Sequence, residues 1–313
     1  VHGSAANLTV TGLALYGARS SAIVAYDDAT IGIARSEFIG NYGQNGGAIS
    51  ANGSSVVIDS TKFYGNSADN YGGAISLNGG SCTINDSEYY SNSVNSYGGA
   101  IYAGNGSSVT IAGSTLGGNF ATTGYGGAIC ANSSSFTIND TAFESNHVQY
   151  DGEGEEGALD GGAIYAGYRS SFTIDGARFS GNYAGGYGGA VAINMVDFFT
   201  VGNSRFESNA AEVCGGAVSV QSSQNVAFTD VSFLGNYAQD KGGALYFGYD
   251  SEGTGTRVDF DYNYASEGED YFCESGSSFI VDPSESVSQS FASLGDDDWL
   301  DVDELDLLAE LFV

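Results

Sequence analysis

Short stretches of the chain alternate apolar and polar residues with a period of two, which is typical of β-strands with one buried face. Four of them share one pattern: SSVVIDSTKF at 54–63, SSVTIAGSTL at 107–116, SSFTINDTAF at 134–143 and SSFTIDGARF at 170–179. Nothing between these strands has a 3.6-residue period long enough for a crossover helix. The pattern therefore predicts an all-β fold.

Two motifs recur in phase with these strands. Gly-Gly-Ala followed by an aliphatic residue begins at Gly46, Gly72, Gly98, Gly126, Gly161, Gly188, Gly215 and Gly242. Phe-x-x-Asn begins at Phe38, Phe63, Phe143, Phe179, Phe206, Phe233 and Phe260, with variants at Tyr89 and Leu116. A unit of about 27 residues with three short strands and three turns is the size of one coil of a parallel β-helix. We expect a solenoid of about ten coils over residues 1–283.

Stacking of coils predicts columns of equivalent side chains. The position after Gly-Gly-Ala is a branched aliphatic residue in every unit and predicts an inward ladder of Ile49, Ile75, Ile101, Ile129, Ile164, Val191, Val218 and Leu245. The Phe of Phe-x-x-Asn predicts a second internal stack, and its Asn is expected to bond to the backbone and to the Asn of neighbouring coils. The glycine pair indicates a positive φ or a very close approach between coils.

At these motifs the chain resembles the chlamydial polymorphic outer membrane proteins, whose passenger regions are defined by repeated Gly-Gly-Ala-Ile/Leu/Val and Phe-x-x-Asn. The resemblance covers roughly residues 20–282. It implies a right-handed, single-stranded parallel β-helix and a role at the cell surface that is often adhesive. This chain is unusually acidic for that family.

The charge of the chain limits the classes of partner that it can bind. Asp and Glu number 38 against 8 Lys and Arg, for a formal net charge of -30. Such a surface repels phosphate groups, so we expect neither nucleic acid nor anionic membrane as a partner. Candidate N-glycosylation sequons favour an extracellular or cell-surface location and lie at Asn7, Asn52, Asn85, Asn105, Asn132 and Asn139. The four cysteines occupy different repeat positions, so stacking predicts no disulfide.

Two sets of residues are candidate binding sites. The longest unit contains the insertion HVQYDGEGEEGALD, whose Asp151, Glu153, Glu155, Glu156 and Asp160 are candidate Ca²⁺ ligands; the alternative is a solvated acidic loop. No other cofactor is expected. Tyr71, Tyr97, Tyr125 and Tyr187 recur just before the glycines and form a candidate aromatic ladder for sugars or another protein. Alternatively, these tyrosines line the wall of the solenoid.

Enzymatic and ice-binding functions are the alternatives. Lys62, Arg178 and Arg205 share one repeat position, which indicates a structural ladder with Glu144 and Glu207 more than a catalytic cluster. A polysaccharide lyase or glycoside hydrolase on a β-helix is the runner-up. Ice binding needs a flat array of Thr. The expected outward column is Thr83, Thr110, Thr137 and Thr173, with Val57 before it and Phe199 after it.

The repeat pattern stops near residue 283. The segment DDDWLDVDELDLLAELFV has acidic residues first and then an apolar face, which predicts a helical cap within 284–313. Taken together, the sequence predicts a non-enzymatic surface protein that acts in adhesion or builds a surface layer or filament. Its expected partners are surface proteins, glycans or further copies of itself.

Overall fold

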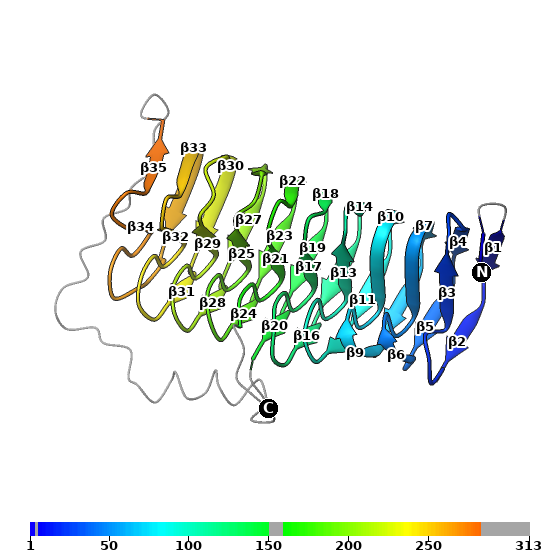
Figure 1. The fold of residues 1–313 in the computed structure, drawn as a ribbon. Coiled ribbons are helices and arrows are strands. Elements are labelled where there is room, and N and C mark those ends of the chain that lie inside the picture. The colour runs from blue at the N-terminus through cyan, green and yellow to red at the C-terminus, as the bar shows by residue number, and fades with distance from the viewer. Residues whose placement is uncertain (4–5, 150–158, 283–313) are drawn as a thin grey trace, which may run out of the picture.

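The computed structural model describes residues 1–3, 6–149 and 159–282, which form a parallel β-solenoid of about ten coils (Figure 1). The coils lie side by side, with β1 (Asn7–Thr11) near one end and β35 (Ser278–Val281) at the other. The described residues contain no helix. The predicted helical cap at 284–313 lies outside them.

Each coil has four strand positions, which we call walls 1 to 4 in chain order. Wall 1 follows Gly-Gly-Ala and contains β3 (Ile23–Tyr26), the first part of β7 (Ile49–Asp59) and of β10 (Ile75–Asn85), β13 (Ile101–Gly104), β17 (Ile129–Ala131), β21 (Ile164–Ala166), β25 (Val191–Asn194), β29 (Val218–Gln221), β32 (Leu245–Gly248) and β34 (Tyr271–Cys273). Wall 2 contains β1, β4 (Thr30–Ala34), the second part of β7 and β10, β14 (Ser108–Ala112), β18 (Ser135–Asn139), β22 (Ser171–Asp175), β26 (Phe198–Gly202), the first part of β30 (Val226–Leu234) and of β33 (Glu252–Asp261), and β35.

Walls 3 and 4 carry the Phe-x-x-Asn motif. Wall 3 contains β2 (Ala14–Tyr16), β5 (Glu37–Ile39), β8 (Lys62–Tyr64), β11 (Glu88–Tyr90), β15 (Thr115–Gly117), β19 (Ala142–Glu144), β23 (Arg178–Ser180), β27 (Arg205–Glu207) and the last parts of β30 and β33. Wall 4 contains β6 (Tyr42–Asn45), β9 (Ser67–Tyr71), β12 (Ser93–Val94), β16 (Phe120–Ala121), β20 (His147–Val148), β24 (Tyr183–Ala184), β28 (Ala210–Ala211) and β31 (Tyr237–Ala238). The sequence predicted three strands per coil. Most strands of wall 4 have only two residues, too few to show alternation.

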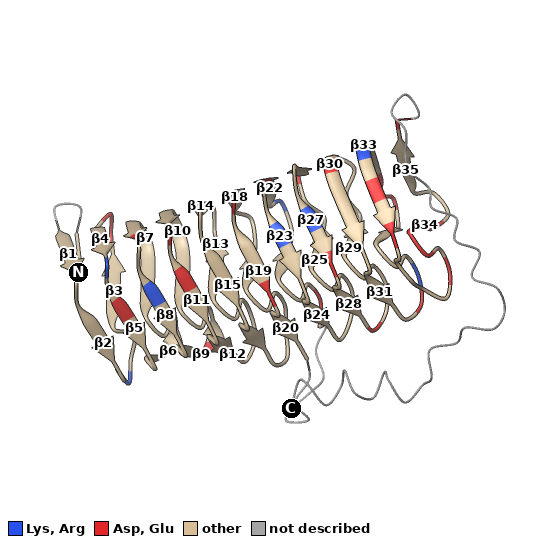
Figure 2. Cartoon of the chain, turned by 180° about the vertical axis from the view of Figure 1, so that it is seen from behind, with Lys and Arg blue, Asp and Glu red and all other residues tan. Residues whose placement is uncertain are grey.

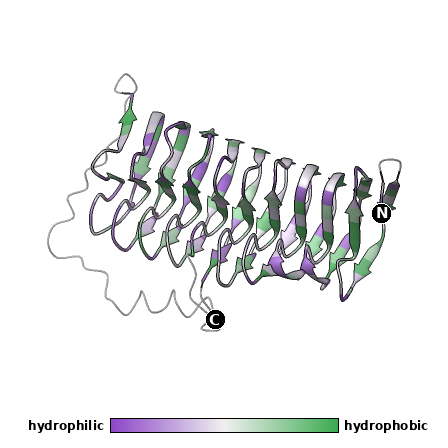
Figure 3. Cartoon of the chain, in the orientation of Figure 1, coloured by the Kyte–Doolittle hydropathy of each residue, from purple (hydrophilic) through white to green (hydrophobic). Residues whose placement is uncertain are grey.

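The aliphatic ladder is confirmed. Ile75 pairs in register with Ile49 on one side and with Ile101 on the other, and all three side chains are fully buried. The same register continues to Leu245. Figure 3 shows hydrophobic and hydrophilic positions interspersed along the length of the solenoid. Like side chains therefore pack on one another along the length of the solenoid.

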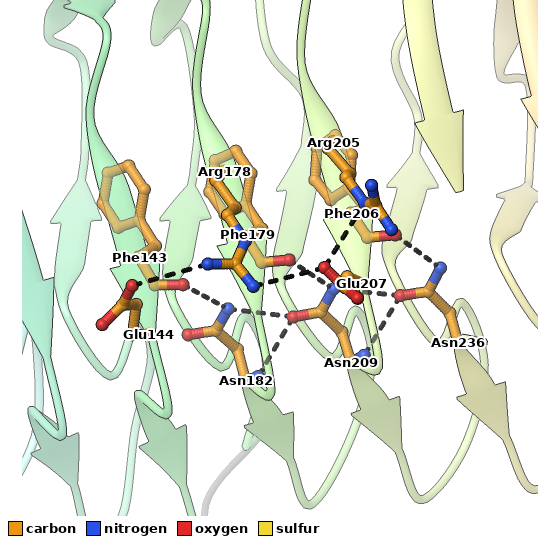
Figure 4. A network of polar contacts seen from close by, with 10 residues as sticks. All are labelled: Phe143, Glu144, Arg178, Phe179, Asn182, Arg205, Phe206, Glu207, Asn209 and Asn236. Carbon is orange, nitrogen blue, oxygen red and sulfur yellow. Dashed lines mark hydrogen bonds and ion pairs between the residues drawn. The ribbon is translucent and has the colours of Figure 1, made fainter. Parts of the chain in front are cut away.

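The phenylalanine stack is also confirmed. Phe143, Phe179 and Phe206 stack with ring centroids 4.7 and 4.5 Å apart and planes within 4° of parallel (Figure 4). Tyr89 takes the same place above Phe63, with centroids 4.6 Å apart. The spacing is close to the separation of neighbouring strands, about 4.8 Å, so the rings are held by the coils that carry them.

A buried asparagine ladder runs beside this stack (Figure 4). Asn182 Nδ2 donates to Asn209 Oδ1 at 2.9 Å and to the carbonyl oxygen of Phe143 at 3.0 Å. The backbone N–H of Asn182 donates to the same Oδ1 at 3.0 Å. Equivalent bonds join Asn41, Asn66, Asn92, Asn119, Asn146, Asn182, Asn209, Asn236 and Asn263. Each amide thus ties three successive coils together.

The two glycines meet two different requirements. Gly72 has a φ of 60°, and a Cβ there would overlap the carbonyl oxygen of Ile75. Gly73 does not have a positive φ, but its Cβ would overlap the carbonyl oxygen of Gly99 in the next coil. The alanine that follows is fully buried, and the carbonyl of Ala74 accepts two N–H groups from the preceding coil. The first glycine therefore has the expected positive φ, and the second allows the expected close approach between coils.

We expect Asn119→Ala to destabilise the solenoid by about 2–5 kcal/mol, because it leaves buried amide and carbonyl groups of neighbouring coils without partners. The matched control is Asn95→Ala, an exposed asparagine in the preceding coil, which should change stability by less than about 0.5 kcal/mol. Chemical denaturation followed by circular dichroism measures both. Equal losses in the two variants would contradict a special role for the ladder.

Candidate binding surface

Tyrosines stack at the corner between walls 4 and 1. Tyr97 pairs with Tyr71 and Tyr125 in neighbouring coils, and its ring centroid lies 5.7 Å from each of theirs, with planes tilted by 16° and 19°. From wall 1, Tyr102 packs on Tyr71 at 4.5 Å and Tyr165 on Tyr125 at 4.2 Å. Burial raises the pKa of Tyr102 to about 12. The predicted ladder therefore exists over these three coils.

The geometry of this ladder favours the wall-lining alternative. The stacked rings turn their faces toward one another, whereas a sugar ring needs an exposed aromatic face. All three tyrosines are only partly exposed. Sugar binding by the ladder stays a prediction.

Asp160 interrupts the tyrosine column. It occupies the position before Gly161, between the coils of Tyr125 and Tyr187, and its Oδ1 accepts the Tyr187 N–H at 2.9 Å. Tyr187 instead lies near Tyr246, with ring centroids 6.2 Å apart. Burial among these groups raises the pKa of Asp160 to about 6, and the hydrogen bond from Tyr187 partly offsets that rise.

Asp160 is the one candidate calcium ligand within the described residues. Asp151, Glu153, Glu155 and Glu156 lie outside them. No group of three or more His, Cys, Asp or Glu placed to hold a metal occurs in the described part of the chain. One oxygen of Asp160 already serves a backbone N–H. The calcium site stays a prediction for the whole insertion.

The sequons lie at wall ends on the N-terminal part of the solenoid. Asn52, Asn105 and Asn132 are exposed at the corner between walls 1 and 2, and Asn7 is exposed at the start of β1. Asn85 and Asn139 end strands of wall 2 and are partly buried. Glycans on these residues would crowd one part of the rod; their presence stays a prediction.

The basic residues of wall 3 form the predicted ion-pair ladder. Arg178 lies 3.3 Å from Glu207 and 4.0 Å from Glu144, and Arg205 lies 3.3 Å from Glu207 (Figure 4). Lys62 pairs instead with Glu88, at 3.1 Å. Glu207 is partly buried and the other side chains are exposed, so solvent screens these pairs and each contributes about 0–1 kcal/mol. Figure 2 shows Asp and Glu spread along the length of the solenoid, with few Lys and Arg.

Three of the four thiols are buried, and Cys273 is partly exposed. All four cysteines are free, as the repeat positions predicted. Burial raises the pKa of Cys82 to about 12 and that of Cys214 to about 11. Because the thiolate is the reactive form, burial lowers the reactivity of Cys82 and Cys214 at neutral pH.

The expected outward column of wall 2 is wrong by one residue at its C-terminal end. Phe199 pairs with Phe172 and is fully buried, while Thr200 pairs with Thr173 and continues the threonine column. The outward aromatic residue is Phe198, which is 43% exposed. Two adjacent phenylalanines obscured the register, and a slip of one residue exchanges the two faces of a strand. The spacing of 27 residues from Thr173 would have identified Thr200.

Two segments, residues 60–78 and 230–248, match the family model of the Chlamydia polymorphic membrane protein repeat. Each spans wall 3, wall 4 and the start of wall 1, and so contains one Phe-x-x-Asn and one Gly-Gly-Ala-aliphatic motif. The chain carries the polymorphic membrane protein repeat. No curated protein and no solved structure matches the chain significantly.

This repeat belongs to a family of surface and outer membrane proteins with a β-helical fold, and the family is not one of enzymes. The family match therefore supports a surface location in general terms. Among the described residues, no helix is long and apolar enough to span a membrane.

We expect Asp160→Asn to stabilise the protein at pH 7 by about 2–3 kcal/mol and to have almost no effect at pH 4. A carboxyl group whose pKa is raised by folding binds its proton more tightly in the folded state, so stability is lost as pH rises from about 4 to about 6. Asparagine keeps an acceptor for Tyr187 without this loss.

Thermal unfolding of both proteins at pH 4 and pH 7 measures the difference. Asp250→Asn removes one exposed carboxylate and is the matched control, which should change stability by less than about 0.5 kcal/mol. A pH-independent effect of Asp160→Asn would show that the carboxyl group does not titrate in this range.

Proposed function

We propose that the protein is a non-enzymatic extracellular or cell-surface rod that acts in adhesion or as a building unit of a surface layer or filament. The unbroken asparagine ladder is the observation that carries the proposal, because it makes the described chain a stiff body with its outward columns exposed from end to end. The repeat of a surface protein family supports the same location. Its partners are surface proteins, glycans or further copies of the chain.

The acidic surface fits this role. With a net charge of -30, neighbouring rods repel one another at low salt and approach when salt or divalent cations screen the charge. The concentration of salt and divalent cations outside the cell then controls whether the rods assemble through their surfaces. A carbohydrate-active enzyme is the alternative, and release of reducing ends from a panel of polysaccharides would establish it.

Immunolabelling of the source cells tests the proposed location. An antibody raised against the purified protein should label intact, unpermeabilised cells, and brief protease treatment of intact cells should remove the signal. A cytosolic protein labelled in parallel is the control and should appear only after permeabilisation. Labelling of this chain that also requires permeabilisation would contradict the proposal.

Ice binding is a second candidate, because wall 2 presents a broader hydroxyl array than the sequence indicated. The threonine column comprises Thr83, Thr110, Thr137, Thr173 and Thr200. Beside it runs a serine column of Ser55, Ser81, Ser108, Ser135 and Ser171. The strands that carry these hydroxyls are about 4.8 Å apart, a regular spacing that a crystalline surface can match. Within the serine column, Ser81 Oγ donates to Ser55 Oγ at 3.2 Å.

We expect a freezing point measurably below the melting point in a solution of the protein if this array binds ice. Thr137→Tyr places a bulky ring in the middle of the array and should abolish the difference, whereas Tyr64→Ala on wall 3 should leave it unchanged. Nanolitre osmometry measures the gap, and its absence in the wild type excludes the candidate.

A further inference from the structure

A shallow groove of about 410 Å³ crosses the outer face of wall 2 near its C-terminal end. Residues of β26, β30, β33 and β35 line it, so it runs along the solenoid axis, across four neighbouring strands. Phe198 and Ile280 stand in its lining and are 43% and 63% exposed. None of the candidate site residues predicted from the sequence takes part in it.

The groove lies where the serine column ends. Ser171 pairs with Phe198, and the two following coils place Asn225 and Glu252 at the same position. Over five coils this column carries only serine, and then it changes to an aromatic ring, an amide and a carboxylate. Repetition serves coil stacking, so a local departure from it at the edge of a groove is a candidate for recognition.

Phe198 differs from the other phenylalanines of the described residues. The stacked rings of wall 3 are covered by their neighbours, whereas no aromatic ring of the described chain stacks on Phe198. Among the described residues, Phe198 is also the only phenylalanine with an exposed side chain. An exposed aromatic ring at a groove can pack against the C–H groups of a sugar ring.

Polar groups with fixed directions accompany the ring. Asn225 Nδ2 donates to the carbonyl oxygen of Asp197 at 3.0 Å, which orients its Oδ1 as an acceptor. Gln224 and Glu252 are exposed in the same lining. Amide and carboxylate groups bond to pairs of sugar hydroxyls, since one offers donors and acceptors and the other two acceptor oxygens.

The chemistry of the groove discriminates among ligands. The backbone groups of β26, β30 and β33 already pair with a neighbouring strand on each side, so a peptide cannot add a strand between them. No Lys or Arg lines the groove, and Glu252 adds a negative charge to a chain of net charge -30. Uronates, sulfated sugars and phosphates are repelled, whereas a neutral glycan is not.

We propose that this groove binds a neutral glycan, with one sugar ring on the face of Phe198 and hydroxyl groups bonded to Asn225 and Glu252. The inference rests on the proposed surface function and names the ligand class of its adhesive form. Which neutral sugar binds depends on where its hydroxyl groups lie relative to Asn225 and Glu252, and a comparison of several oligosaccharides identifies it.

Binding of the purified chain to immobilised oligosaccharides tests this inference. The probes are neutral cello-, xylo-, manno- and chito-oligosaccharides, with oligogalacturonate and oligoalginate as anionic probes. The best neutral probe is then measured by titration calorimetry. Phe198→Ala should weaken its binding by at least about tenfold, and Phe198→Tyr should retain it because the ring face is kept.

Tyr64→Ala removes an exposed ring from wall 3 and is the matched control, with no change in binding expected. Equal thermal midpoints of the four proteins establish that binding, not folding, is compared. The inference is overturned if no neutral probe binds, if binding survives Phe198→Ala, or if only the anionic probes bind. Surface labelling of cells would still stand in each of these cases, so the failure of this inference is distinct from that of the proposed function.

Discussion

The exact registration of each coil on the next is the constraint on which the whole structure depends, and the buried asparagine ladder enforces it. Each amide bonds to groups that lie one coil away on either side. If one coil is displaced relative to its neighbours, several buried donors lose their acceptors. The second glycine of each pair adds a steric limit, because it leaves no room between the corner and the next carbonyl. The coil height is therefore nearly constant along the rod.

This constraint separates the parts of the chain that vary freely from those that do not. Asn146 Nδ2 donates to Asn182 Oδ1, 36 residues later, at 3.0 Å, close to the 2.9 Å of the same bond between coils of ordinary length. The longer unit is thus accommodated between wall 4 and the corner glycines without disturbing the ladder. Insertions and outward substitutions leave stacking intact, so selection for binding can act on them without loss of the fold.

The sequence predicted the columns that repeat a chemical identity, and missed the features that depend on a single coil. The aliphatic, phenylalanine and asparagine columns were predictable because each coil must bury the same kind of group at the same place. Wall 4 was not, because two residues show no alternation. Phe199 was assigned to the wrong face because identical neighbours conceal a one-residue slip, and that slip also hid Phe198. The sequence places Asp160 directly before Gly161, where four other units have tyrosine, so the gap in the tyrosine column was predictable. The burial of Asp160 was not, because it depends on how neighbouring coils pack around it.

In this molecule, a position that departs from the repeat therefore indicates a ligand-binding site better than a residue type that recurs in every coil. Tyr71, Tyr97 and Tyr125 form the regular column that looks most like a binding surface, but their rings stack face toward face and so serve the packing of the coils. Phe198 stands alone where its column changes chemistry, and its ring has no neighbour to stack on. In a solenoid whose coils must resemble one another to pack, a ligand can be distinguished only at a coil that differs, because a uniform face offers every position along the rod the same contacts.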